Sequence, residues 1–285
     1  MLKVEWYVFK DFLEAEPQAS RDKLNKILSS DLFDDLHKIQ KMEGHPHLGF
    51  LTEKENLNQI HYTWLIPFFQ SLSDHDRYLF VSVLIEEHKE GLYKFFDLTK
   101  EPKELSLVAQ KYSISLIHHE IFSKNTDLLP IACLPHNPLN NLLTLSRKQL
   151  LIFVDLLSMH DLAYEMSNLI NASSLDKIKK ILKPEQKKYL SSLAKHVEPI
   201  TFKSMGLSLW NGDEESLKSI LHQRGLNRLA KALVYSHPSF IFHLQHKLDT
   251  GRASVVKTLI RQLKNKKAHQ ILISQVCRLL EIVKT

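Results

Sequence analysis

Glycine is scarce in this chain of 285 residues: there are only 7, and none lies between Gly91 and Gly206. An all-β sandwich or barrel needs many tight turns, so this scarcity argues against that class. Neither GxGxxG nor GxxxxGK[ST] occurs, which rules out the usual phosphate-cradling loops of nucleotide-binding enzymes. Valine and threonine are also few, at 12 and 9, whereas leucine occurs 49 times. Because leucine favours helices and β-branched residues favour strands, the composition predicts an all-α fold.

Cysteine is nearly missing as well. Cys133 and Cys277 lie in apolar sequence and lack the short-spaced partners of a disulfide framework or a cysteine zinc site. We expect two buried free thiols in a reducing compartment. No apolar run approaches the roughly 20 residues of a membrane span, and charged residues interrupt the N-terminus, which is therefore unlike a signal peptide. The sequence predicts a cytoplasmic protein with no transmembrane segment.

Motifs for metal binding and nucleophilic catalysis are lacking too, since HExxH and GxSxG do not occur. Among 16 histidines, His243 and His246 form the one pair at helical metal-ligand spacing, with Asp249 one turn further on. Such a pair is more often an ordinary part of an amphipathic helix. We therefore expect no metal, no cofactor and no catalytic residue, and we predict that the chain is not an enzyme.

Apolar stripes and capping signals predict helices along nearly the whole chain. In the first half the expected starts are Ser20, Asp31, Glu53, Ser73 and Pro102. Pro67 is expected to break the third of these helices, and Gly91 to end the fourth.

The second half is predicted to be a train of short helices. Their expected starts include Ser146, Asp161, Ser173, Pro184 and the Asx-rich turn NGDE, and Gly225 is expected to end the helix that follows this turn. Further helices are expected over LNRLAKALVYS, PSFIFHLQHKLDTG and RASVVKTLIRQLKN, followed by one through Val283. Short connections predict antiparallel or steeply crossing neighbours.

Residues 123–141 hold three prolines and four asparagines and form the best boundary in the sequence. This predicts an N-terminal helical subdomain over 1–125, a Pro/Asn-rich connector over 126–141, and a C-terminal short-helix subdomain with a basic end over 142–285. The connector contains enough leucine and isoleucine to be packed down.

An aromatic group stands near the start of the first subdomain, with Tyr62, Trp64, Phe68 and Phe69. Side chains of this kind at this spacing most often belong to a core. The alternative is a hydrophobic groove that holds a helix of a partner protein.

Positive charge is concentrated at the C-terminal end. The chain has 38 Lys and Arg against 32 Asp and Glu, a net charge of +6, and residues 252–285 contain eight of the bases but only one acid, Glu281. An apolar stripe is expected on a helix over 252–264, formed by Val255, Val256, Leu259, Ile260 and Leu263. The candidate partner-binding residues lie outside this stripe and are Lys257, Arg261, Lys264, Lys266 and Lys267.

This basic face has three interpretations: a solvated surface, a docking site for an acidic protein surface, or a site for nucleic acid or anionic lipid. Nucleic acid is disfavoured because no aromatic residue is interleaved with the bases.

The segments LSRKQLLIFVDLLSMHDLAYEMSNLI, RGLNRLAKAL and FHLQHKLDTGRASVVKTLI form a run of short helices from Leu145 to about Leu263. In helix order this run resembles the flagellar rotor switch protein FliG. It is more similar to the FliG-like, SctK-type cytoplasmic components of chlamydial type III secretion systems, which IHYTWLIPFFQSLSDHDRYLFVSVL in the first half also resembles. The rotor protein's EHPQ and MFxF signatures are not matched, so no individual functional residue carries over.

The resemblance implies a FliG-like superhelix in the second subdomain and an assembly role. The chain would be a non-enzymatic scaffold or adaptor of a sorting platform or rotor-like complex, peripheral to the inner membrane through that complex. The alternative is another helical protein-binding module, such as a secretion regulator or gatekeeper. Its partners would be proteins of a secretion apparatus or another complex.

Overall fold

A computed structural model describes residues 51–100, 104–125, 127–168, 172–193, 204–207, 210–260 and 266–284, with isolated positions 18 and 23. Every regular element in these ranges is a helix and none is a strand, which confirms the all-α fold. The helices expected from Ser20 and Asp31 lie outside the described residues.

The first part of the described chain contains five α-helices and one 3-10 helix: α4 (Glu53–Gln59), η2 (Tyr62–Trp64), α5 (Ile66–Gln70), α6 (Asp74–Ser82), α7 (Glu86–Phe96) and α8 (Leu107–Phe122). Two 3-10 helices follow, η3 (Ile131–Cys133) and η4 (Pro138–Thr144). The remaining helices are α9 (Arg147–Leu157), α10 (Met159–Ser167), α11 (Ala172–Ile181), α12 (Pro184–Leu193), α13 (Glu214–Ala232), α14 (Pro238–Lys247), α15 (Thr250–Leu259) and α16 (Lys266–Lys284).

Several helix starts follow directly from the capping signals. The hydroxyl oxygen of Ser73 accepts a hydrogen bond from the backbone N–H of Asp76 at 3.2 Å and so caps α6. Ser146 and Gln149 form a reciprocal capping box at the start of α9. Pro184 is the first residue of α12, where its missing N–H is harmless. These three predictions are confirmed.

Three expected breaks are wrong. Gly91 lies inside α7, which ends instead at Asp97 in the left-handed conformation (φ 53°). A side chain at Gly91 would meet the ring of Tyr62 at 2.5 Å, so this glycine makes room for a close contact and does not end a helix. Pro67 sits in the first turn of α5, and the break falls earlier, at the extended residue Ile60.

Two helix boundaries in the second half also differ from expectation. Gly225 is buried in the middle of α13, which continues through it, and Asp161 is a buried residue within α10 rather than its first one. The expected start at Ser173 also falls inside a helix, α11. Each of these residues was taken for a boundary signal, whereas tertiary contacts explain the placement of Gly225 and Asp161.

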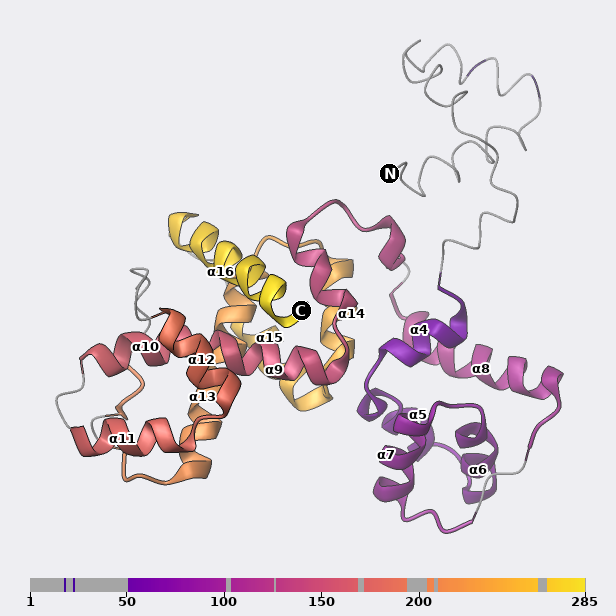
Figure 1. The fold of residues 1–285 in the computed structure, drawn as a ribbon. Coiled ribbons are helices and arrows are strands. Elements are labelled where there is room, and N and C mark those ends of the chain that lie inside the picture. Colours follow the sequence, from indigo (N-terminus) through magenta and orange to yellow (C-terminus); the bar gives the residue numbers. More distant parts are fainter. Residues whose placement is uncertain are drawn as a thin grey trace.

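The buried apolar side chains fall into two clusters. The first, called here the N-terminal cluster, draws on residues between Leu57 and Ile117, and the second, the C-terminal cluster, on residues between Leu134 and Leu280. Figure 1 shows α4–α8 gathered in one part and α9–α16 in another, with α14 on the side of the second part nearest to α4. Trp64 packs against both clusters. Leu134 and Leu139 are buried in the connector region, so this segment is packed down.

Helix α13 is central to the C-terminal cluster, where it packs against α9, α15 and α16. Gly225 permits the contact with α9, because a Cβ atom there would lie 1.9 Å from the carbonyl oxygen of Val154. One turn further on, Arg228 is buried and donates to Asp161 of α10 and Gln275 of α16, each at 2.6 Å. Cys133 and Cys277 are free, but both are half-buried rather than buried as expected.

Candidate functional site

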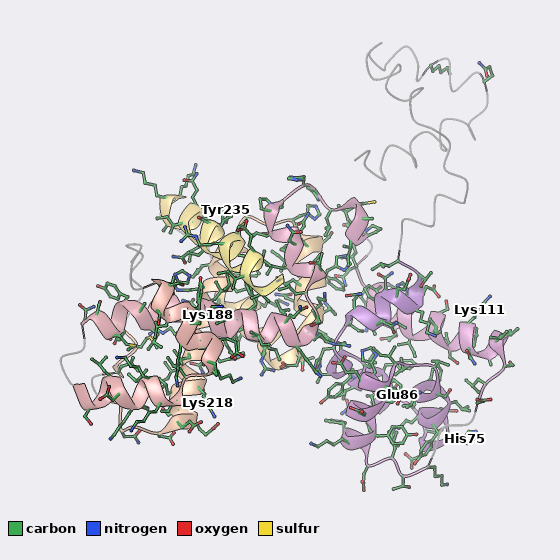
Figure 2. The ribbon with its side chains drawn as sticks, in the orientation of Figure 1. His75, Glu86, Lys111, Lys188, Lys218 and Tyr235 are labelled. Carbon is green, nitrogen blue, oxygen red and sulfur yellow. The ribbon has the colours of Figure 1, made fainter. Side chains whose placement is uncertain are left out.

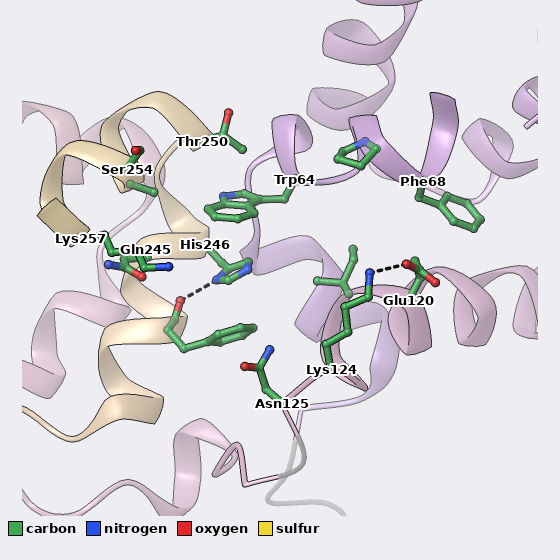
Figure 3. A pocket seen from close by; sticks show the side chains of 14 residues that line it. Trp64, Phe68, Glu120, Lys124, Asn125, Gln245, His246, Thr250, Ser254 and Lys257 are labelled. Carbon is green, nitrogen blue, oxygen red and sulfur yellow. Dashed lines mark hydrogen bonds and ion pairs between the residues drawn. The ribbon is translucent and has the colours of Figure 1, made fainter. Parts of the chain in front are cut away.

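A groove with a volume of about 600 Å³ lies where the two parts meet. Figure 3 shows its walls: η2, α5 and the end of α8 on one side, and α14 with α15 on the other. The lining is largely aromatic and aliphatic, and Glu120, Lys124 and Lys257 supply its charged groups. Lys124 is paired with Glu120 at 2.7 Å. Apolar grooves with a few charged groups are typical sites for amphipathic helices.

An aromatic sandwich forms the floor between the two walls. The imidazole ring of His246 is stacked between the ring of Trp64, at a centroid distance of 4.0 Å, and the ring of Phe242, at 3.8 Å. The indole N–H of Trp64 donates to the carbonyl oxygen of Leu248 at 2.9 Å. His246 itself donates through Nδ1 to the carbonyl oxygen of Phe242 at 2.8 Å. The polar atoms of this sandwich are therefore bound to backbone, and its ring surfaces join the two clusters.

Further hydrogen bonds hold η2 against α14. The backbone N–H of His61 donates to the carbonyl oxygen of His246 at 2.7 Å, and the backbone N–H of Thr250 donates to Oγ1 of Thr63 at 3.1 Å. Arg147, the first residue of α9, donates to the carbonyl oxygen of Ile60 and pairs with Glu87 at 2.6 Å. The groove thus has preformed walls, which lowers the entropic cost of binding a ligand.

Buried histidines accompany these contacts. Burial lowers the pKa of His88 to about 4, and that of His246 also to about 4. His88 Nε2 donates to the carbonyl oxygen of Ile60 at 2.8 Å, while its buried Nδ1 has no hydrogen-bond partner in the described chain. A second proton on His88 would therefore be a buried donor without an acceptor. Both rings are neutral at pH 7.

These depressed values predict that acid weakens the fold. Below pH 6.5 the unfolded chain takes up protons at these histidines, while the folded chain does not until about pH 4. Their contribution to stability is fully present above pH 6.5 and is lost as the pH falls toward 4, at about 1.4 kcal/mol per pH unit for each ring. Urea unfolding at pH 7 and pH 5 should show a smaller loss in His246→Phe, which keeps the stacking, than in the wild type.

His75→Gln is the matched control for this experiment, because His75 is exposed on α6, far from the junction (Figure 2). It should show the wild-type loss between pH 7 and pH 5. Equal losses in the wild type and in His246→Phe would contradict the prediction.

The structure places only part of the predicted basic face. Lys257 is exposed on α15 and reaches the groove, and Lys266 and Lys267 are exposed at the start of α16. Arg261 and Lys264 lie outside the described residues. The expected helix over 252–264 ends at Leu259, and Val255 is exposed, so it does not belong to the buried stripe, whereas Val256 does. The five lysines and arginines remain a predicted surface of which Lys257 is the member beside the groove.

The histidine pair considered for a metal has other contacts. His243 Nε2 lies 2.8 Å from the carbonyl oxygen of Leu129, His246 is in the sandwich, and Asp249 caps α15 and pairs with Arg252. Among the described residues no group of three or more His, Cys, Asp or Glu could hold a metal ion.

One Asp–His pair lies outside the groove. His222 Nδ1 is 2.7 Å from Asp155, and Arg252 donates to His222 Nε2 at 2.8 Å. The nitrogen that a general base would use is thus already an acceptor, and the pair links α9, α13 and α15. That the chain is not an enzyme stays a prediction.

A second cavity, of about 430 Å³, lies beside the start of α9 and is polar. Lys247 lines it and donates to the carbonyl oxygens of Leu143 and Leu145, at 2.6 Å for the latter. Burial, and then the nearby Arg147, lowers the pKa of Lys247 to about 8. Since these cations already hold backbone and Glu87, the cavity is a structural feature of the junction.

Sequence reasoning identified Trp64 and Phe68 only as an aromatic group whose alternative interpretation was a groove. It missed Phe242, Gln245 and Ser254, which line the opposite wall. No local signal marks these residues, because they become partners of Trp64 only through a contact across 184 positions of sequence. No protein-family profile, curated protein or solved structure matches the sequence. None of the described helices is both long and apolar enough to cross a bilayer.

Proposed function

We propose that this chain is a non-enzymatic helical adaptor whose groove binds an amphipathic helix of a partner protein. The observation that carries the proposal is the preformed groove itself, with the Trp64–His246–Phe242 sandwich as its floor and Lys257 at its edge. Apolar side chains of the partner helix would cover the exposed ring surfaces, and a carboxylate on its polar side would meet Lys257. No acidic residue of the described chain pairs with Lys257, so its charge is open to such a partner.

The setting we propose is a cytoplasmic type III secretion assembly, of the sorting-platform or rotor-like kind. This part of the proposal rests on the sequence resemblance of the short-helix run to FliG-like, SctK-type proteins. In that setting the partner helix would belong to another protein of the apparatus, and Lys266, Lys267 and the remaining bases would extend the contact to an acidic surface.

A photo-crosslinking amino acid at Ser254 tests the proposal in cells that contain the native complex. Ser254 is exposed on the groove wall, so its replacement leaves the buried core intact. We expect cross-linking to a secretion-apparatus protein through a segment with an apolar stripe and acidic residues. The same amino acid at Lys188, exposed on α12 at the other end of the molecule (Figure 2), should not capture that protein. Capture of a regulator or a protein outside secretion would favour the alternative module, and equal capture from both positions would refute the groove.

Lys257→Glu gives the quantitative prediction for the partner identified in this way. Charge reversal at the edge of the groove should weaken binding about tenfold at low salt, equivalent to about 1.4 kcal/mol. The loss should shrink at high salt, because screening acts beyond roughly 8–10 Å. Lys188→Glu is the matched control and should bind as the wild type does. Calorimetry at two salt concentrations measures both effects, and a folded Lys257→Glu with unchanged affinity would show that this lysine is merely solvated.

A further inference from the structure

Helix α8 carries an unpartnered apolar face. Val108, Leu107 and Tyr112 are 79%, 76% and 65% exposed, the highest values among the exposed large apolar side chains of the described chain. Val108, Tyr112 and Leu116 follow one another at four-residue spacing, so they share one side of the helix. Ile114 and Ile117 on the opposite side are buried in the N-terminal cluster. A helix that is apolar on both sides is normally covered on both sides.

The chain enters the described structure next to this face. Glu53, the first residue of α4, accepts a hydrogen bond through Oε1 from Ser115 Oγ of α8 at 3.2 Å, and the same oxygen lies 4.0 Å from His118 Nδ1. Residues 1–50 immediately precede this point and lie outside the described residues. Ten residues, 41–50, can span up to about 33 Å, whereas α8 from Ser115 back to Val108 rises only about 10 Å.

The sequence of residues 31–40, DLFDDLHKIQ, has properties that fit the uncovered face. Leu32, Leu36 and Ile39 are spaced as one side of a helix, and three aspartates give the segment a net negative charge. The first ten residues of α8 carry Lys111 and no acid. The apolar stripes and the charges of the two segments are therefore complementary.

We propose that residues 31–40 pack against the α8 face formed by Leu107, Val108, Tyr112 and Leu116. Leu32, Leu36 and Ile39 contact the apolar side chains, and the aspartates lie near Lys111. This contact is independent of the groove, which involves only the last residues of α8. The face is thus an intramolecular docking site that covers the N-terminal cluster.

A photo-crosslinking amino acid at Tyr112 of the full-length, purified protein tests this directly. A mixture of isotope-labelled and unlabelled chains separates cross-links within one chain from those between two. We expect digestion and mass spectrometry to map the cross-links to residues 31–40 of the same chain. The matched control is the same amino acid at Phe95, an aromatic residue 53% exposed on α7, which should give no cross-link to that segment.

A second variant tests the other partner in the contact. Leu36→Asp should lower the yield of the Tyr112 cross-link about tenfold, because it places a charge in an apolar contact. Lys38→Asp, off the stripe, should leave the yield unchanged. Cross-links between labelled and unlabelled chains would show that a second copy covers the face, and the absence of any cross-link to residues 31–40 would show that it is open to another protein. Either result overturns the proposal.

Discussion

Replacing Asp161 by alanine is expected to lower the free energy of unfolding by about 3–5 kcal/mol. Asp161 and Arg228 are 6% and 2% exposed, and their charged groups are 2.6 Å apart inside the C-terminal cluster. Without the carboxylate, Arg228 keeps its charge in a buried place, with Gln275 as a neutral partner. An uncompensated buried charge costs far more than the lost hydrogen bond alone. Urea unfolding followed by circular dichroism measures the change.

The control for this experiment removes the charge as well. In the triple variant Asp161→Leu, Arg228→Met and Gln275→Leu, apolar side chains of similar size replace the whole polar group, and most of the lost stability should return. A loss of under about 1 kcal/mol in Asp161→Ala would contradict the prediction, because surface substitutions already reach half that value.

Replacing Gly225 by alanine should destabilise the protein by about 3 kcal/mol or more, at the upper end for overpacking. In an open helix the same change would stabilise by up to about 1 kcal/mol, since alanine is the better helix former. Here the new Cβ would lie 1.9 Å from the Val154 carbonyl oxygen and 2.8 Å from its carbonyl carbon. Both atoms are backbone, so α13 and α9 must separate along their contact, and the thermal midpoint should fall accordingly.

Gly251→Ala is the matched control for Gly225→Ala. Gly251 is also helical, in the first turn of α15, but it is exposed, and the nearest atom to an added Cβ is Oδ1 of the Asp249 side chain, at 3.2 Å. Alanine there should be neutral or slightly stabilising. Two glycines in helices would then respond in opposite directions, and similar responses would show that the α9–α13 contact tolerates a wider spacing.

These residues also show how far the sequence predicts the fold. The all-α class and the starts of α6, α9 and α12 depend on composition and on capping within three residues, and both are readable locally. Gly91 and Gly225 misled, because a glycine that ends a helix and a glycine that admits a neighbouring residue look alike in sequence. Asp161 misled for the same reason: an acid at a helix start and an acid paired with Arg228, 67 positions away, have similar local surroundings.

The candidate site was less predictable than the fold. Trp64 and Lys257 were singled out separately, one as an aromatic residue and the other as a base, and nothing in the sequence joins them. The groove exists because η2 lies against α14, through hydrogen bonds from Trp64 to Leu248 and from His61 to His246. These are backbone acceptors, which every residue possesses, so no pattern of side chains announces them.

The hydrogen bond between Trp64 and Leu248 has a consequence for biosynthesis. Its two residues are separated by 184 positions, which a ribosome covers in roughly 10–40 s. The N-terminal cluster has contacts of short sequence separation and can form as soon as α8 emerges. During the interval before α14 appears, the indole of Trp64, the carbonyl oxygen of Ile60 and the ring of His88 face the nascent chain's surroundings without Leu248 or Arg147. The half-made protein therefore displays the surface by which its two parts later join, and a chaperone that shields apolar surface would act there during translation.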